Sequence, residues 1–246
     1  MRTIKLGEGD RLATFFTLNF GKIKAVAKGS AKPKSRFGGR LEPFNVVNMI
    51  AFGKEKAELL RLNSLDVMER FAALGGSLEN MARAWACAEL VDYLQKDRDE
   101  NREGFRLLVW AWRALAEERN PEKQDFLLRM FELKYLETAG LKPILDRCAS
   151  CGGAITARGG GFSSRKGGAL CHNCLRFDSA ACRVSAGAIM LMSKGLKTPF
   201  DKLGRLSAGK GAQEEIGAAL SDFIGAHVRR HMKTTRFIKL SEAISR

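Results

Sequence analysis

Four cysteines form two pairs whose spacing is typical of a metal site. Cys148 and Cys151 enclose two residues, Cys171 and Cys174 enclose two more, and residues 152–170 separate the pairs. Two residues between thiolates allow one tight turn to direct both sulfurs toward one ion, and two such turns complete a tetrahedral site of four thiolates. We therefore predict one zinc ion per chain, bound by these four cysteines. The alternative is a set of buried cysteines without metal.

The predicted zinc site has the chemistry of a structural element. Four thiolates fill the tetrahedron and leave no open position for an activated water. His172 lies within the second pair and is an alternative ligand, although Cys174 has the more usual spacing. Cys87 and Cys182 fit better as packing residues. No P-loop, nucleophile elbow or HExxH signature occurs in the sequence, so we predict a protein that is not an enzyme.

A basic segment over residues 22–40 contains seven cations and no carboxylate. Its cations are Lys22, Lys24, Lys28, Lys32, Lys34, Arg36 and Arg40. Because such a segment repels itself unless an anion lies against it, we expect phosphates to bind here with release of counterions. Phe37 lies among the cations, where a base can stack on it or where it can anchor the loop to the barrel. A solvated surface without a partner is the remaining alternative.

The net charge identifies a second basic region near the C-terminus. The chain has 246 residues and a formal charge of +15, of which residues 1–71 carry +7, residues 72–182 carry +1 and residues 183–246 carry +7. The C-terminal cations that we assign to DNA binding are Arg229, Arg230, Lys233 and Arg236. A chain this basic attracts polyanions, either nucleic acid or an acidic membrane face. If its ends meet in space, they form one continuous basic surface.

Hydropathy restricts the location of the protein. No stretch approaches the roughly 18 apolar residues of a membrane span, and the first residues lack the apolar region of a secretory signal. We therefore expect a cytoplasmic protein without membrane contact. Its cysteines are expected to stay reduced, which favours metal binding or packing over disulfides.

The hydrophobic pattern divides the chain into a β-rich part and a helical part. Short strands are predicted at residues 12–18, 22–29, 44–52 and about 57–62, and such a series favours a small barrel. Helices are predicted to begin near Ser77, Phe105, Asn120 and Ser185, with a longer one from about Gln213 to Met232. Acidic runs such as residues 97–100 are assigned to helix surfaces. We expect one domain at residues 1–71 and a second at 72–246, with a zinc-binding insertion at about 146–180.

Several segments, in one order along nearly the whole chain, resemble bacterial RecO recombination-mediator proteins. They are GEGDRL at residues 7–12, GKI and AKG at 21–29, KSRFGG followed by LEPF at 34–44, FELK at 131–134 and RRHMKTTRF at 229–237. RecO proteins usually carry several more residues before the segment that matches Arg2 to Lys5. We therefore expect either a misassigned start or a short first strand.

The resemblance implies an α+β fold with an N-terminal OB-fold barrel, an α-helical C-terminal domain and an inserted zinc-ribbon-like motif that contains the four cysteines. It also implies a function, since RecO proteins bind single- and double-stranded DNA, anneal complementary strands without nucleotide, and load RecA in RecF-pathway repair. The implied partners are DNA, RecR, the C-terminal tail of single-strand-binding protein and, indirectly, RecA. Some members lack the cysteines, which implies that the metal is not central to the shared activity. The expected location is the cytoplasm, in association with the nucleoid.

A mechanism without bond chemistry agrees with this function. A basic surface that neutralises two strands lowers the repulsion between them and lets their bases sample pairing. The nearly neutral residues 72–182 are expected to dock the tail of single-strand-binding protein. The alternative is a zinc-ribbon transcription or translation factor, which would show sequence preference and depend on its metal. A zinc-supported nuclease, which would cleave strands with added Mg²⁺, is a weaker alternative.

Overall fold

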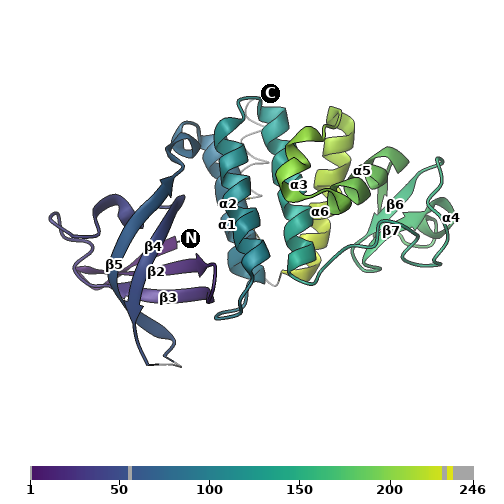
Figure 1. Ribbon diagram of the computed structural model, residues 1–246. Helices are drawn as coiled ribbons and strands as arrows, with labels where there is room; N and C mark the ends of the chain where they lie inside the picture. Colours follow the sequence, from purple (N-terminus) through teal and green to yellow (C-terminus); the bar gives the residue numbers. More distant parts are fainter. Residues whose placement is uncertain (1, 55–56, 229–231, 235–246) are drawn as a thin grey trace.

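The computed structural model describes residues 2–54, 57–228 and 232–234, and it has three parts in a row (Figure 1). A five-stranded sheet lies at one end, a bundle of helices in the middle and a three-stranded sheet at the other end. The basic segment therefore belongs to one end of the molecule and the cysteine pairs to the other. None of the helices in the described ranges is long and apolar enough to cross a membrane.

The first sheet is a barrel of five strands. They are β1 (Arg2–Leu6), β2 (Asp10–Thr17), β3 (Gly21–Ala27), β4 (Asn45–Phe52) and β5 (Leu59–Arg70). Their order is β1-β2-β3-β5-β4, with β3 and β5 parallel and the other pairs antiparallel, which is the order of an OB-fold. Burial alternates along β3, as the sequence pattern predicts, with Ile23, Ala25 and Ala27 turned inward.

One strand of the barrel is longer than the sequence predicts, and the first strand is short. The strand expected at about residues 57–62 is the start of β5, which continues to Arg70, and a register shift after Leu62 lets both Leu62 and Leu65 turn inward. The short β1 pairs with β2 along all of its residues. Among the described residues β4 pairs only with β5, so the barrel is open beside β4.

Within the described ranges, five helices longer than two turns form the bundle. They are α1 (Leu78–Leu94), α2 (Arg102–Glu117), α3 (Pro121–Thr138), α5 (Ala186–Lys197) and α6 (Lys210–His227). The predicted caps are present: Ser77 accepts a hydrogen bond from the amide of Asn80, and Asn120 accepts one from Glu122 ahead of Pro121 at the first helical position. The last helix differs from its predicted range of about 213–232, because Val228 takes an extended conformation and ends it.

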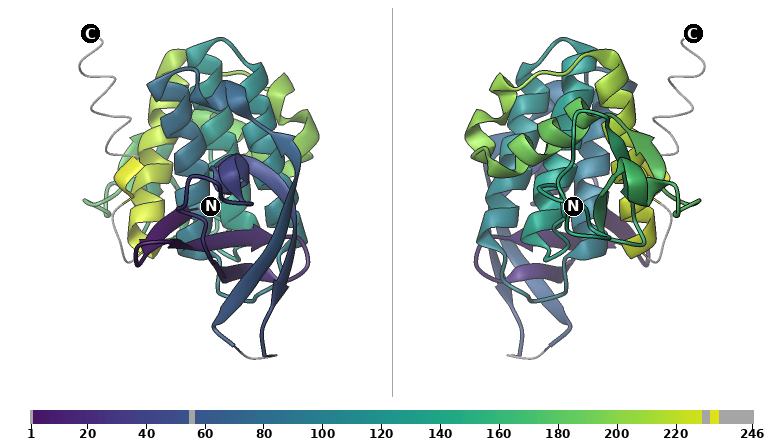
Figure 2. Two further views of the ribbon diagram at one scale, coloured as in Figure 1. Left: turned by 90° about the vertical axis from the view of Figure 1, so that its left-hand side faces the viewer. Right: turned by 90° about the vertical axis from the view of Figure 1, so that its right-hand side faces the viewer.

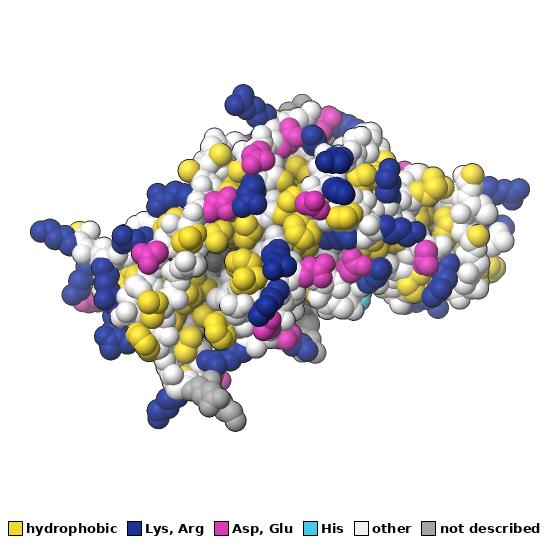
Figure 3. Space-filling model, in the orientation of Figure 1, with side chains coloured by type: hydrophobic (Ala, Val, Ile, Leu, Met, Phe, Trp, Pro, Cys, Tyr) yellow, Lys and Arg dark blue, Asp and Glu magenta, His cyan; other side chains and the backbone are white. Residues whose placement is uncertain are grey.

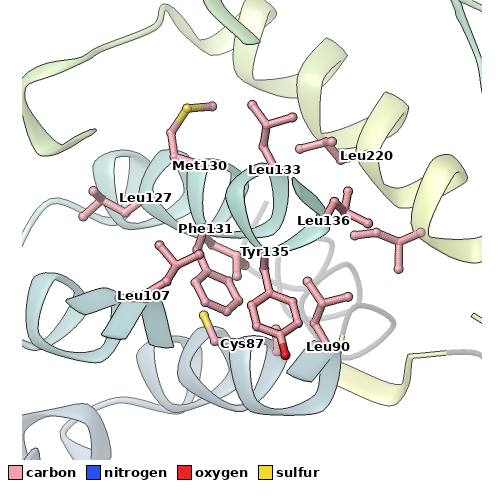
Figure 4. Packing of buried hydrophobic residues seen from close by; sticks show 14 of the residues in the cluster. Cys87, Leu90, Leu107, Leu127, Met130, Phe131, Leu133, Tyr135, Leu136 and Leu220 are labelled. Carbon is pink, nitrogen blue, oxygen red and sulfur yellow. The ribbon is translucent and has the colours of Figure 1, made fainter. Parts of the chain in front are cut away.

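The bundle is organised around α3, which lies between α1 and α6 (Figure 4). Phe131, Leu133, Tyr135 and Leu136 of α3 are fully buried in a cluster to which α1, α2, α5 and α6 all contribute. Cys87 of α1 is among these residues, which confirms its prediction as a packing residue.

The barrel and the bundle share this core through aromatic contacts. The ring of Phe44 lies 5.2 Å from that of Trp85 and 5.4 Å from that of Trp112, both edge-on. Phe16 lies 5.9 Å from Phe105 of α2. Figure 1 shows the barrel beside the first two helices, and the left view of Figure 2 shows its strands in front of the bundle. The barrel is therefore fixed on the bundle by buried rings as well as by the chain.

The small sheet contains β6 (Gly160–Ser163), β7 (Gly168–Cys171) and β8 (Cys182–Val184), with the short α4 (His172–Leu175) after β7. β6 and β7 form the hairpin that the spacer between the cysteine pairs predicts. The ring of Phe162 on β6 meets that of Phe223 on α6 at 5.6 Å, which attaches the small sheet to the bundle.

Candidate nucleic-acid interface and metal site

The loop after β3, residues 28–40, carries the exposed part of the basic segment. Its cations Lys28, Lys32, Lys34, Arg36 and Arg40 are all exposed. In the described parts of the chain, no ion pair involves any of them. In Figure 3, Lys and Arg side chains gather at this free end of the barrel. The loop therefore presents positive charge that the protein itself does not neutralise.

Backbone hydrogen bonds and a buried aromatic ring hold this loop against the barrel. The amide of Gly29 donates to Asp10 Oδ1 at 2.8 Å, and the amide of Ala31 donates to the Gly9 carbonyl at 3.0 Å. Phe37 is only 1% exposed and belongs to the barrel core with Leu41. A base cannot stack on a ring that is covered on both faces, so the assignment of Phe37 to DNA binding is corrected. It is the loop anchor that the sequence left as the alternative.

Lys22 and Lys24 both pair with carboxylates of the helical part, and Lys22 is nearly buried. The ammonium of Lys22 lies 3.4 Å from carboxylate oxygens of both Asp92 and Asp97, and its side chain is 11% exposed. Lys24 pairs with Asp97 at 2.7 Å. Burial raises the pKa of Asp97, but the two lysines outweigh burial and hold it below its usual value. The structure thus corrects the assignment of Lys22, which attaches β3 to the bundle, whereas Lys24 takes part in this attachment and stays a prediction for DNA binding.

The acidic run 97–100 is part of this attachment and does not lie on a helix, in contrast to its expected place. It connects α1 to α2 and packs against β3, with the Arg98 amide donating to the Lys22 carbonyl at 2.9 Å. Gly21 has φ +61°, and a Cβ there would lie 2.0 Å from the Asp99 carbonyl oxygen. Only glycine therefore permits this close approach of the loop to the barrel.

The C-terminal basic region is only partly described. Arg229, Arg230 and Arg236 lie outside the described residues. Lys233 is exposed, and its backbone amide and that of Thr234 each donate to the Glu89 carboxylate of α1 at 3.0 Å. The segment 232–234 is thus attached to α1.

Both ends of the chain therefore meet on one helix. Glu89 binds the C-terminal segment, and Asp92, three residues later, binds Arg2 of β1 at 3.5 Å as well as Lys22. Residues three apart share a helix face. Sequence reasoning missed these carboxylates, although their spacing on a predicted helix was the available signal. The start of β1 and the segment 232–234 therefore lie on the same face of α1.

The four predicted metal ligands come together at the far end of the molecule. The sulfurs of Cys148, Cys151, Cys171 and Cys174 all lie within 4.8 Å of one another. The Sγ atoms of Cys151 and Cys171 are 3.9 Å apart. Metal–sulfur bonds of about 2.3 Å in a tetrahedron separate the sulfurs by roughly 3.8 Å, so the arrangement fits one ion. Among the described residues, the cluster does not include His172.

The protonation of the four thiols also favours a cation. Burial raises the pKa of Cys148, but hydrogen bonds from the backbone amides of Cys171, Cys151 and Ser150 lower it to about 6. The neighbouring sulfurs of Cys151 and Cys171 raise the pKa of Cys174 to about 12. Four sulfurs this close cannot all be thiolates without a positive ion between them. The residues can therefore bind a metal ion.

Replacing Glu89 with Gln is expected to release the C-terminal segment from α1. Burial raises the pKa of Glu89, but hydrogen bonds from Thr234, Lys233 and Tyr93 outweigh it and lower the pKa. The stabilisation that the ionised Glu89 provides is thus fully present above the pKa of a carboxyl group in the unfolded chain. It is lost as the pH falls through the lower pKa of Glu89 in the folded protein. We expect Glu89→Gln to cost about 1 kcal/mol of stability and to raise hydrogen exchange at residues 233–234 at pH 7. Glu117→Gln, an exposed carboxylate on α2, is the control, and equal protection in both variants would contradict the assignment.

Comparison with known proteins covers almost the whole chain. Residues 1–71 match the family region described as the N terminal of recombination protein O, and residues 75–236 match its C terminal. The DNA repair protein RecO of Anaeromyxobacter sp. (strain K) is 35% identical over 242 residues, which are 97% of this chain and 92% of that protein. The DNA repair protein RecO of Pelotomaculum thermopropionicum is 32% identical over 238 residues, 97% of this chain and 90% of that protein. With an OB-fold barrel, a helical C-terminal part and both family regions in order, the chain belongs to the RecO family of DNA repair and recombination proteins.

Proposed function

We propose that this protein is a recombination mediator without enzymatic activity, which binds single- and double-stranded DNA and anneals complementary strands without nucleotide. The observation that carries the proposal is the loop of residues 28–40, where five exposed cations have no carboxylate partner among the described residues. Membership of the RecO family supports the same function. We place it in RecF-pathway repair, in the cytoplasm at the nucleoid.

The physical basis is cancellation of phosphate charge. Two single strands repel each other, and cations that bind both backbones remove much of that repulsion while the bases stay free to pair. The basic loop supplies one group of cations. Arg229, Arg230, Lys233 and Arg236 would supply the second, and the attachment of residues 233–234 to the helix that also holds β1 and β3 supports this.

The protein partners of this proposal are RecR, the C-terminal tail of single-strand-binding protein and, indirectly, RecA. The helical middle is the surface that we assign to them, because residues 72–138, which contain α1, α2 and α3, hold 10 Lys and Arg against 13 Asp and Glu and are a poor surface for DNA. It lies between the basic barrel and the small sheet, so a protein bound there need not displace DNA from the loop (Figure 1).

The metal in the proposed mediator is one structural Zn²⁺ per chain. Four thiolates are a usual ligand set for structural zinc and leave no site for a reacting water. The cysteines lie at the end of the molecule opposite the basic loop (Figure 1). The ion therefore stabilises the small sheet and takes no part in strand pairing.

Charge reversal in the loop is expected to change the salt dependence of DNA binding. The test variant is the triple reversal Lys32→Glu, Lys34→Glu, Arg36→Glu. Its slope of log affinity for single-stranded DNA against log salt concentration should be smaller by about 2 than that of the wild type, since each phosphate contact contributes roughly 0.7. The matched control is the triple reversal Lys194→Glu, Lys197→Glu, Lys202→Glu, which makes the same charge change on exposed residues of the bundle. If both variants alter the slope equally, the loop is not the site and only the net charge matters.

The annealing proposal is tested with complementary dye-labelled oligonucleotides coated with single-strand-binding protein. Addition of the protein without nucleotide should bring the dyes together, measured as energy transfer. The loop reversal should slow this pairing at least tenfold, whereas the bundle reversal should leave the rate close to that of the wild type. A wild-type protein that binds the coated strands but does not pair them would reject annealing.

Removal of the metal is expected to act only at the small sheet. Cys174→Ser should lose the bound zinc, and its residues 144–184 should lose protection from hydrogen exchange, because structural zinc sites contribute folding energy. Cys182→Ser is the control, since Cys182 lies outside the cluster. The salt slope of DNA binding and the annealing rate should be unchanged in both. Loss of annealing with the metal would favour the zinc-ribbon transcription or translation factor.

A further inference from the structure

A cavity of about 820 Å³ lies between the barrel and α2. It is lined by β2 with the turn that follows it, by β4 and by α2, and its aromatic lining residues are Phe15, Phe16, Phe20, Phe105 and Trp112. This volume lies within the range of pockets that hold small organic ligands. In Figure 3, hydrophobic side chains gather over the barrel and at its junction with the helices.

The cavity is more than a packing defect because its mouth combines exposed aromatic and polar groups. Phe20 is 68% exposed at the turn between β2 and β3. Asn19 and Lys54 are also exposed lining residues, and Arg98 and Glu100 add one charge of each sign. The edge of β4 along the cavity has no partner strand among the described residues. An exposed ring beside amide and cationic groups is suited to a flat, polar-edged ligand attached to an anion.

The cavity is continuous with the basic loop. Asn45, at the start of β4, lines the cavity, and its side-chain amide donates to the carbonyls of Gly39 and Arg40 at 3.2 and 3.4 Å. The loop that carries the exposed cations thus ends at one end of the cavity. Lys54 lies beyond the opposite end of the same strand. Cations therefore stand at both ends of an aromatic cleft that follows β4.

We propose that this cavity receives bases of a single DNA strand whose phosphates lie on the basic loop. The inference rests on the proposed function and adds the part of the ligand that the loop alone does not recognise. Phe37 cannot stack on a base because it is buried, whereas Phe20 offers an open ring and Phe15 and Phe105 are only partly buried. A base in the cleft must leave its stack and its partner, so the cavity favours single strands over duplex.

The test compares two oligonucleotides of equal length, one of thymidines and one of abasic residues, which carry the same phosphates. The wild-type protein should bind the thymidine strand roughly tenfold more tightly, the size expected for a stacked base. Phe20→Ala should bring the two affinities together by weakening only the thymidine strand. Val109→Trp, which fills the cavity from α2, should do the same.

The matched control is Phe177→Ala, which removes an 88% exposed ring from the small sheet end and should keep the tenfold difference. Phe20 is exposed, so its replacement leaves the core intact, and thermal melting verifies this. Equal wild-type affinities, or a Phe20→Ala variant that weakens both strands alike, would overturn the cavity proposal while the loop still binds DNA. Absence of binding to either strand would instead reject the proposed function. If Val109→Trp changes only the oligomeric state, the cleft is a contact between copies of this chain and the proposal fails.

Discussion

The ammonium of Lys22 is the contact on which the arrangement of the molecule depends. It is nearly buried, and an ammonium in such a place is stable only with anions around it. Asp92 at the end of α1 and Asp97 in the following loop supply them, and the Asp92 carbonyl accepts a further hydrogen bond at 2.6 Å. Removal of both carboxylates would leave the ammonium uncompensated between the barrel and the bundle. The contact thus determines how β3 is seated on the helices.

A second set of contacts fixes the orientation of the barrel on the bundle. The ring of Phe44 lies between Trp85 and Trp112, and Arg113 of α2 makes a two-pronged ion pair with Glu69 of β5 at 2.7 and 3.1 Å. Attachments at separate strands prevent the barrel from rotating about any one of them. The loop that leaves β3 at its other end is therefore directed away from the bundle (Figure 1). The exposure of this loop follows from the burial of Lys22 near the start of β3.

The basic segment thus contains two kinds of cation with opposite roles. Those on β3 are neutralised by carboxylates that come from α1 and the loop after it. Those in residues 28–40 repel one another. The loop stays ordered because the buried Phe37 ring holds it from beneath, together with the Gly29 amide on the Asp10 carboxylate and the Ala31 amide on the Gly9 carbonyl. An ordered loop that keeps its repulsion releases that energy when an anion binds, which favours binding of a polyanion over collapse onto the protein.

Local signals predicted what depends on local structure. The two Cys-x-x-C turns, the Ser77 and Asn120 caps and the alternation along β3 each involve residues close in sequence, and each is present. The roles of Lys22 and Lys24 could not be read from the sequence because their partners lie about 70 residues away. Phe37 was ambiguous for the same reason: a ring among cations is exposed or buried according to what the barrel places beneath it. The cavity also escaped prediction, since it exists only where β4 and α2 meet.

The same distinction between local and distant contacts explains why the metal and the DNA surface are separable. The small sheet has three strands of three or four residues, too short to be stable alone. Its own supports are the four cysteines, the Phe162–Phe223 contact and the buried carboxylate of Asp178, which accepts from Ser163 at 2.7 Å and pairs with Arg165 at 3.2 Å. None of these groups touches the barrel, whose loop is held by Asp10 and Phe37 and whose β3 is held by Asp92 of α1. Loss of the metal is therefore expected to leave the cations of the basic loop in place, because the groups that hold this loop lie at the other end of the molecule.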